Sequence, residues 1–353
     1  MDYAQTTLPY VTAALPGTGG ALKRTAAHFC VTELPAYLPD GNAEGKFLYL
    51  ELERQGQSTR QVSEAVAQAF AVSREDIGTA GQKDTVATVR QWFSVRLESK
   101  AARTGWEERL AALRGLYTVH QAAWHGNKLK TGHLRGNRFA VVISDVGPEA
   151  LSRAQAVVEQ LRATGVPNYY GPQRFAQDNL ARAVALLRGE RKVRDPWQAR
   201  FLTSVYQSHV CNLYLARRVE AGLFGQILIG DLCTKLASGG MFDCVDAATD
   251  QPRYLSSEIS YTAPMPGRAM RAPAPGTAAA EFEDSVLQPC AEDIARIRAD
   301  GTRRAGCLRP AELAVQAHPE GLRVPLELPR GSYATVVLRE IMKNDAALAE
   351  SED

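Results

Sequence analysis

The sequence predicts an α+β protein with a mixed sheet and a long groove, and three observations lead to this prediction. Residues 47–53 and 89–98 alternate in polarity with the period of a strand. The segment between them has the apolar spacing of an amphipathic helix, followed by a glycine-containing turn. The order strand, helix, turn, strand differs from the regular βαβ alternation that builds a parallel sheet.

Length and composition indicate a globular protein. The chain has 353 residues, so two domains are expected, and its apolar fraction of 45% and charged fraction of 23% are ordinary. Its 6 cysteines form no C-x-x-C pair and no metal-like spacing with histidine, which argues against a zinc site and a disulfide framework. There is no secretion signal and no apolar run of membrane-spanning length. We therefore expect a cytoplasmic protein with no metal and no membrane contact.

The charge distribution is more informative than the net charge of +2. Residues 109–144 contain no Asp or Glu. The basic residues in this span are Arg109, Arg114, Lys128, Lys130, Arg135 and Arg138. A second basic run extends over residues 174–200. An acid-free span of this length favours a surface that faces phosphates, because each acid there would repel a phosphate backbone.

The first elements follow in order along the chain. Residues 29–33 favour a short strand, which the residues alone explain as an edge strand with one buried aromatic ring. Residues 47–53 place leucines at every second position and predict a half-buried strand. Ser58 and Gln61 have the spacing of a capping box and predict the start of a helix. The apolar face of this helix is Val62, Ala65, Val66, Ala69 and Phe70.

The later elements are predicted in the same way. After the turn at 78–85 and the strand at 89–98 come a short helix at 106–117, a basic, turn-rich segment at 120–137, a strand at 139–143 and a helix at 148–165. Residues 179–224 are predicted to be helical, and dense glycine and proline at 239–276 predict loops and a hinge. A strand at 322–328, a turn at 329–332, a helix with Ser332 as N-cap and a disordered acidic end at 349–353 complete the prediction.

The turn at residues 78–85 places Asp84 beside Lys83 between a helix and a strand. From the residues alone, Asp84 has two possible tasks. It can cap the turn by accepting backbone N–H bonds, which is a common use of Asp, or it can act chemically in a cleft.

Five segments, in order, carry the motifs of one known family. Residues 29–33 fit F-x-V-x-E, residues 81–95 read GQKDTVATVRQWFSV, residues 128–139 fit K-L-K-x-G-x-L-x-G-N-x-F, residues 166–176 fit V-P-N-Y-F-G-x-Q-R-F-G except that Ala176 replaces the last glycine, and residues 328–335 fit L-P-x-G-S-[FY]-A-T. Together they resemble the TruD family of tRNA pseudouridine synthases, in which the Asp after Gly-x-Lys is catalytic.

The resemblance implies a fold and a function. The fold would be a pseudouridine synthase-type catalytic domain, with a mixed, mainly antiparallel sheet and a central cleft, at residues 1–164 and 309–353. An inserted α+β TRUD domain would occupy residues 165–308. The function would be isomerisation of uridine to pseudouridine in tRNA, at position 13, by a monomeric enzyme that needs no cofactor.

The resemblance also implies the site. Asp84 would be catalytic, as a nucleophile or as a base that removes a proton from the sugar. Phe139 would stack on the everted base between Phe29 and Tyr333, and Asn137 would hold the pocket loops or the uracil edge. The remaining substrate-binding residues would be Lys23, Glu33, Lys83 and Arg174. Of these, the three cations would favour the ionised form of Asp84.

Two alternatives remain at this stage. A phosphate-cradling loop of a nucleotide-binding enzyme would need G-x-x-x-x-G-K-[ST], but Gln82 separates Gly81 from Lys83, and Asp84 would repel phosphate. A non-catalytic tRNA-binding protein, or an RNA chaperone of the same fold, would keep the basic surface without the reaction. The presence of Asp84, Asn137 and Phe139 argues against the second alternative.

Overall fold

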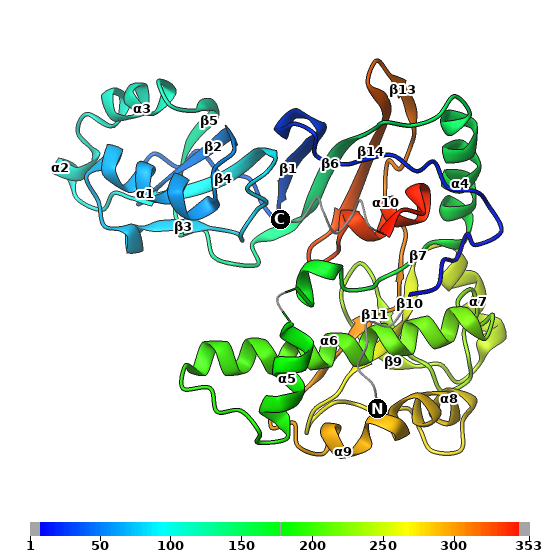
Figure 1. Ribbon diagram of the computed structural model, residues 1–353. Helices are drawn as coiled ribbons and strands as arrows, with labels where there is room; N and C mark the ends of the chain where they lie inside the picture. Colours follow the sequence, from blue (N-terminus) through cyan, green and yellow to red (C-terminus); the bar gives the residue numbers. More distant parts are fainter. Residues whose placement is uncertain (1–7, 177, 346–353) are drawn as a thin grey trace. The chain divides into compact units, whose positions relative to one another are not determined.

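The computed structural model describes residues 8–176 and 178–345, which form two compact units (Figure 1). We call Gly19–Leu151 with Ala311–Gly331 the sheet unit, and Met1–Thr18 with Ser152–Pro310 and Ser332–Asp353 the α6 unit. The predicted domains group the terminal segments differently, so their boundaries stay a prediction. The acidic end at 349–353 lies outside the described residues.

The sheet unit is built on eight strands in the order β13-β14-β6-β1-β4-β2-β5, with β3 paired to β4. The strands are β1 Phe29–Pro35, β2 Phe47–Gln55, β3 Ile77–Thr79, β4 Thr88–Arg96, β5 Thr118–His125, β6 Leu134–Ser144, β13 Gln316–His318 and β14 Gly321–Pro329. The helices are α1 Thr59–Phe70, α2 Lys100–Arg103 and α3 Trp106–Arg114. β1 and β4 are parallel, and the other described pairs of this sheet are antiparallel. A mixed, mainly antiparallel sheet is therefore confirmed.

The predicted helix and its cap are confirmed in α1. The Ser58 side chain accepts the Gln61 N–H, and the Gln61 side chain accepts the Ser58 N–H, which is a capping box. Val62, Val66 and Phe70 of this helix are fully buried in a cluster with the leucines of β2. This packing covers one face of β2.

The prediction that β2 is half-buried is wrong, because its other face is covered too. Tyr49 is buried in a cluster with Trp92 and Leu129. Glu51 is also buried, and Arg90 binds its two carboxylate oxygens at 2.7 and 2.6 Å. A bidentate arginine makes such burial tolerable, since it satisfies both oxygens of the carboxylate.

The prediction of turns over residues 120–137 is partly wrong. Residues 118–125 form the edge strand β5, and β6 begins at Leu134. β5 is mostly exposed or half-buried, and among the described strands it pairs with β2 alone, so its polar residues conceal the strand pattern. Strand propensity is weakest as a guide at such edges.

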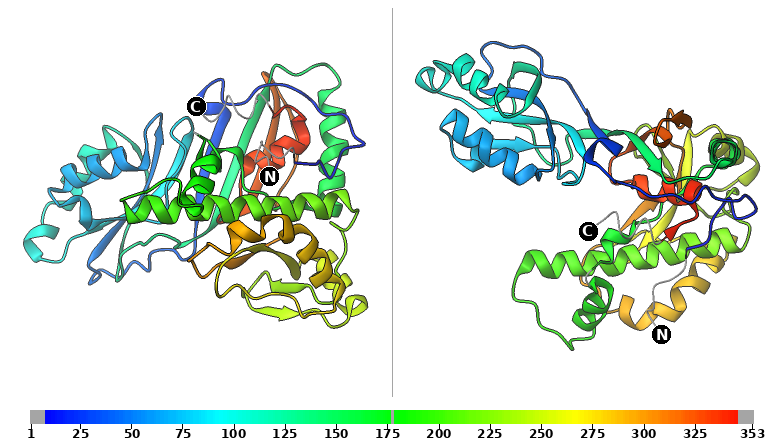
Figure 2. Two further views of the ribbon diagram at one scale, coloured as in Figure 1. Left: turned by 60° about the horizontal axis from the view of Figure 1, so that its bottom comes forward. Right: turned by 45° about the horizontal axis from the view of Figure 1, so that its top comes forward.

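The α6 unit combines a long helix with two small sheets. Its helices are α4 Ala150–Thr164, α5 Asn179–Leu187, α6 Pro196–Glu220, α7 Ala247–Leu255, α8 Ala278–Leu287, α9 Ala291–Ile294 and α10 Ala334–Met342. Its strands are β7 Val166–Pro167, β8 Leu232–Lys235, β9 Met241–Asp243, β10 Ile259–Met265, β11 Thr302–Ala305 and β12 Cys307–Leu308. The order β11-β10-β8-β9 makes one sheet, and β12 with β7 makes the other. α6 contacts α5 and packs on β10 (Figure 2).

The prediction of loops over residues 239–276 is partly wrong, because β9, α7 and β10 lie within 241–265, whereas 266–276 contain no helix or strand. β10 is buried along its whole length. The residues of β10 that pair with β8 end at Tyr261. Pro264 has no N–H to donate, and it lies beyond these paired residues, on the part of β10 that β8 does not reach.

The sequence predicts the end of α4 and the buried face of α10 correctly, but it predicts the N-cap of α10 wrongly. Gly165, with φ +80°, ends α4 as expected. Val337 and Ile341 of α10 are fully buried as expected. Ser332 as N-cap is wrong, because Tyr333 occupies the cap position and its side chain makes no capping hydrogen bond, while the Ser332 hydroxyl lies 3.5 Å from Asn168 Oδ1. Within residues 8–176 and 178–345, each helix is too short or too polar to cross a bilayer.

Candidate active site

The register of β1 and β4 explains why Lys23 and Asp84 meet. The two strands are parallel neighbours, with Cys30 opposite Thr88, so the segments that precede them lie at one edge of the sheet. Lys23 and Asp84 belong to these segments, and Lys23 Nζ lies 3.8 Å from Asp84 Oδ1. The lysine side chain is 5% exposed and the aspartate side chain is 33% exposed. A solvent-accessible carboxylate thus lies beside a nearly buried cation.

The turn that carries Asp84 is fixed through its backbone by a buried polar network. Arg54 donates to the Asp84 carbonyl and to the Thr59 hydroxyl, each at 3.3 Å. The Thr59 hydroxyl donates to Gln91 Oε1 at 3.1 Å, and Gln91 Nε2 donates to the Gly81 carbonyl at 2.8 Å. Because these bonds reach main-chain carbonyls at both ends of the turn, they position Asp84 without occupying its carboxylate.

Arg54 is a positioning residue that the sequence analysis missed. It is buried, and burial lowers the pKa of its guanidinium, an effect that the nearby Asp84 opposes. A signal was present, since Arg54 follows Leu52 by two residues and so continues the core face of β2. A charged residue at a predicted core position indicates a buried network, because an unpaired charge would be too costly there.

The local topology argues against the nucleotide-binding alternative. In a Walker A loop, a strand leads through the loop into a helix whose N-terminus faces the phosphates. Here β3 leads through the turn into strand β4. The turn therefore lacks the helix N-terminus that such a site requires.

Lys83 pairs with Glu33 at 2.6 Å, and these two side chains are 6% and 0% exposed. Glu33 also accepts the Trp92 N–H at 3.4 Å. Burial raises the pKa of Glu33, and Lys83 is the main influence that lowers it. The Lys83 ammonium is thus engaged with Glu33, whereas Lys23 is the lysine that pairs with Asp84.

Replacing Lys83 by Met is expected to make the stability of the protein depend on pH. The variant leaves the buried Glu33 carboxylate unpaired, so its pKa in the folded state rises further above the unfolded value. A raised folded pKa favours the folded state at low pH and loses this benefit as the pH rises. We expect a loss of about 2 to 3 kcal/mol in the free energy of unfolding at pH 8, and a smaller loss at pH 5.5.

Urea unfolding at the two pH values measures this difference. Lys46→Met is the matched control, because Lys46 is 62% exposed and pairs with Glu98 at the surface. The control should change stability by less than about 0.5 kcal/mol at both pH values. An equal loss at pH 5.5 and pH 8 in Lys83→Met would contradict the expectation.

An aromatic pair lies next to Lys23. The Lys23 ammonium is 4.6 Å from the centroid of the Phe29 ring. Phe29 meets Phe139 edge to face, with ring centroids 6.1 Å apart. Both rings are buried, and the pairing of Val31 with Phe139 places Phe139 on the same sheet face as Phe29. Phe29, Phe139, Lys23 and Asp84 therefore form one cluster.

Asn137 lies on that same face, two residues before Phe139 and opposite Glu33 in the β1–β6 ladder. Its Oδ1 is buried and has no hydrogen-bond partner among the described residues. A buried acceptor without a donor is uncommon, because it costs free energy. The atom is therefore suited to a donor brought by a ligand.

Arg174 and Tyr333, the two remaining predicted site residues, belong to the α6 unit. Arg174 donates to the hydroxyls of Ser204 at 2.6 Å and Ser208 at 3.3 Å, so it is held against α6. The Tyr333 ring meets the Tyr170 ring edge to face at 5.9 Å. Among the described residues, no three or more His, Cys, Asp or Glu side chains gather as metal ligands.

Comparison with known proteins agrees with these motifs. The model of the family "tRNA pseudouridine synthase D (TruD)" matches residues 6–190 and 188–341. The tRNA pseudouridine synthase D of Anaeromyxobacter dehalogenans is 44% identical over 361 residues, covering 99% of this chain and 100% of that protein. That of Thermus thermophilus is 40% identical over 344 residues, covering 96% and 93%.

A solved structure gives the fold independently. The crystal structure of a Methanosarcina mazei protein described as tRNA pseudouridine synthase D aligns with a TM-score of 0.74 and 21% identity, covering 95% of this chain and 96% of that one. The family model and the full-length relatives agree on one family, and this solved structure has the same α+β fold. The chain belongs to the tRNA pseudouridine synthase D (TruD) family.

Proposed function

We propose that the chain converts uridine to pseudouridine at position 13 of tRNA, with the Asp84 carboxylate as the catalytic group. Family membership over the whole chain supports the pseudouridine synthase activity, and the choice of position rests on the family resemblance. The observation that carries the assignment of Asp84 is its partly exposed carboxylate, 3.8 Å from the nearly buried Lys23 ammonium.

The reaction is an isomerisation in which no atom is added. The bond between N1 of uracil and C1′ of ribose breaks, the base rotates, and C5 forms a new bond to C1′. The proton on C5 then leaves to solvent, and N1 takes up a proton. Asp84 acts at the sugar, either by attacking it as a nucleophile or by removing one of its protons. Both routes need an ionised carboxylate, and the Lys23 ammonium lies 3.8 Å from Asp84 Oδ1.

The freed base must be held while it rotates. Everting it costs a few kcal/mol, and stacking on an aromatic ring returns about 1 to 3 kcal/mol. Phe139 is the proposed stacking ring, supported by Phe29. The unpartnered Oδ1 of Asn137 is the proposed acceptor for a uracil N–H.

Replacing Phe139 by Ala is expected to slow turnover about ten- to hundredfold, because base stacking is lost. The dissociation constant for tRNA should change less than about threefold, since most RNA contacts are made elsewhere. Single-turnover rates and filter binding measure the two quantities. Phe139→Leu serves as the control for packing and should slow turnover while keeping the stability of the folded protein. Equal losses in turnover and binding would make Phe139 a general RNA contact.

The proposed partner is tRNA, bound through the basic residues of the two spans at 109–144 and 174–200. Affinity should therefore fall steeply with salt. The monomeric state and the cytoplasmic location stay predictions. Sedimentation of the purified chain at micromolar concentration would test the monomeric state.

Release of tritium from tRNA labelled at C5 of uridine tests the proposed activity. The wild-type protein is expected to release one equivalent per modified uridine without any added cofactor. If it binds tRNA but releases no tritium, the protein is a tRNA-binding module, and the proposed catalysis is wrong.

A further inference from the structure

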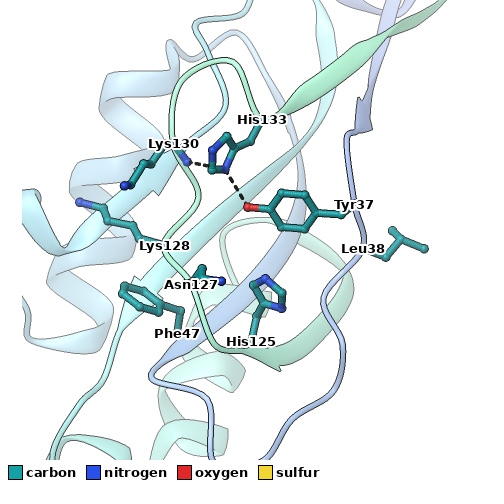
Figure 3. Close-up of a pocket in the computed structure, with 8 residues that line it drawn as sticks. All are labelled: Tyr37, Leu38, Phe47, His125, Asn127, Lys128, Lys130 and His133. Atoms are coloured by element: carbon teal, nitrogen blue, oxygen red, sulfur yellow. Dashed lines mark hydrogen bonds between the residues drawn. The ribbon is translucent and has the colours of Figure 1, made fainter. Parts of the chain in front are cut away.

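The sheet unit contains a surface pocket of about 680 Å³ that is separate from the Asp84 cluster (Figure 3). We call it the Tyr37 pocket. Its lining residues are Tyr37, Leu38, Phe47, His125, Asn127, Lys128, Lys130 and His133. They come from the segment after β1, from the start of β2, from the end of β5 and from the loop that joins β5 to β6. The residues that line it are aromatic, basic, amide and aliphatic, with no Asp or Glu.

The hydrogen bonds around His133 fix its tautomer. The Lys130 backbone N–H, which can only donate, points at His133 Nδ1 at 3.3 Å. Nδ1 is therefore the acceptor, and it also takes the Tyr37 hydroxyl at 2.7 Å (Figure 3). In the neutral ring the proton then lies on Nε2. The pocket thus gains an N–H donor that has no partner among the described residues.

The pocket also offers an open ring and an unpaired cation. Tyr37 is 36% exposed, and its ring lies 5.3 Å from that of His125 with a tilt of 30°. Lys130 is exposed, and its ammonium forms no ion pair among the described residues. Asp40, a half-exposed carboxylate beside the pocket, lies with Oδ1 3.2 Å from His125 Nδ1, and its backbone N–H donates to the same nitrogen at 3.4 Å. A flat ring face, a cation and an N–H donor are groups that bind a nucleotide.

We propose that the Tyr37 pocket is a second nucleotide subsite, which holds an unpaired nucleotide of the RNA substrate away from the uridine that reacts. The base would pack on Tyr37, and its phosphate would meet Lys130 and the Nε2–H of His133. This inference rests on the proposed function for its choice of RNA. The acid-free sequence around Lys128 and Lys130 agrees with an approach of the RNA backbone from this side.

The pocket is joined to the catalytic turn by direct contacts. The Gly132 N–H, in the loop that lines the pocket, donates to the Ala80 carbonyl at 2.8 Å. Leu129 of the same loop packs with Ala80, and its N–H donates to the Ser94 hydroxyl of β4 at 3.0 Å. A nucleotide bound in the pocket would therefore hold the loop that supports the turn leading to Asp84.

The test measures tRNA binding by filter retention at several salt concentrations. Tyr37→Ala should raise the dissociation constant about tenfold, because one stacked base is lost, whereas Tyr37→Phe keeps the ring and should stay within about twofold. Lys130→Ala should weaken binding and reduce the slope of log K against log salt by about one. Lys100→Ala changes an exposed lysine of α2 and should leave the dissociation constant and the salt slope unchanged. Unchanged unfolding midpoints confirm that the variants are folded.

The outcomes separate this inference from the proposed function. If the wild type is active and Tyr37→Ala binds tRNA normally, the subsite is wrong while the catalysis stands. If the wild type releases no tritium but Tyr37→Ala weakens RNA binding, the subsite stands while the catalysis is wrong. A titration with uridine monophosphate tests whether the pocket binds free nucleotides instead. Micromolar binding that Tyr37→Ala removes, with tRNA affinity unchanged, would make the pocket a site for free nucleotides and overturn the RNA assignment.

Discussion

Asp84→Asn is expected to lower the rate of tritium release from tRNA by at least about 10³-fold. The amide has the shape of the carboxylate, but it is neither an effective nucleophile nor a base. The turn should survive, because the network from Arg54, Thr59 and Gln91 holds main-chain atoms. The dissociation constant for tRNA should stay the same or fall slightly, since a negative charge is removed near RNA phosphates.

Asp145→Asn is the matched control for this variant. Asp145 belongs to the same unit, is 58% exposed and pairs with Arg24 at the surface. Its replacement should leave tritium release within about twofold, because surface ion pairs contribute little. Turnover by Asp84→Asn near the wild-type rate would remove Asp84 from the chemistry and leave it as a turn residue.

Arg218→Met is expected to lower the free energy of unfolding by about 3 to 5 kcal/mol. Arg218 of α6 and Asp231 are 0% and 2% exposed and are joined by two bonds of 2.8 and 2.7 Å. The guanidinium also lies 3.7 Å from the centroid of the Tyr261 ring in β10. Removing it leaves a buried carboxylate without its cation, which is the costly way to break such a pair.

Two variants identify the cause of that loss. Arg217→Met changes the neighbouring arginine, which is 68% exposed and pairs with Glu220, and should cost less than about 0.5 kcal/mol. Arg218→Met combined with Asp231→Leu removes both charges and should recover part of the stability. Urea unfolding of the full-length chain measures all three. A loss in Arg217→Met equal to that in Arg218→Met would contradict the assignment to the buried pair.

The sequence predicts the turn that carries Asp84 well because its signals are local. The capping box of α1 and the strand β4 lie within residues 58–96, and both are confirmed by the structure, although Trp92 and Ser94 on the second face of β4 are buried too. The meeting of Lys23 with Asp84 depends instead on β1 and β4 being parallel neighbours. Periodicity carries no information about strand order, so the residues alone could not place these side chains together.

Burial of charge is the part that sequence patterns conceal. Glu33 and Glu51 are buried, although charged residues are usually exposed, because partners distant in the chain satisfy them. Arg54 is buried as well, and one of its bonds reaches the distant Asp84 carbonyl. The same limit applies to the acid-free span. Arg138 lies within it but pairs with Glu327, which β14 brings alongside β6. A basic span in the sequence is therefore only partly a basic surface.

Mapping of pseudouridine in tRNA from cells that lack this chain tests the central claim most directly. The account predicts unmodified uridine at position 13 in those cells, pseudouridine after the wild-type chain is restored, and uridine after Asp84→Asn is restored at equal abundance. Pseudouridine at that position without the chain, or its return with Asp84→Asn, would contradict the account.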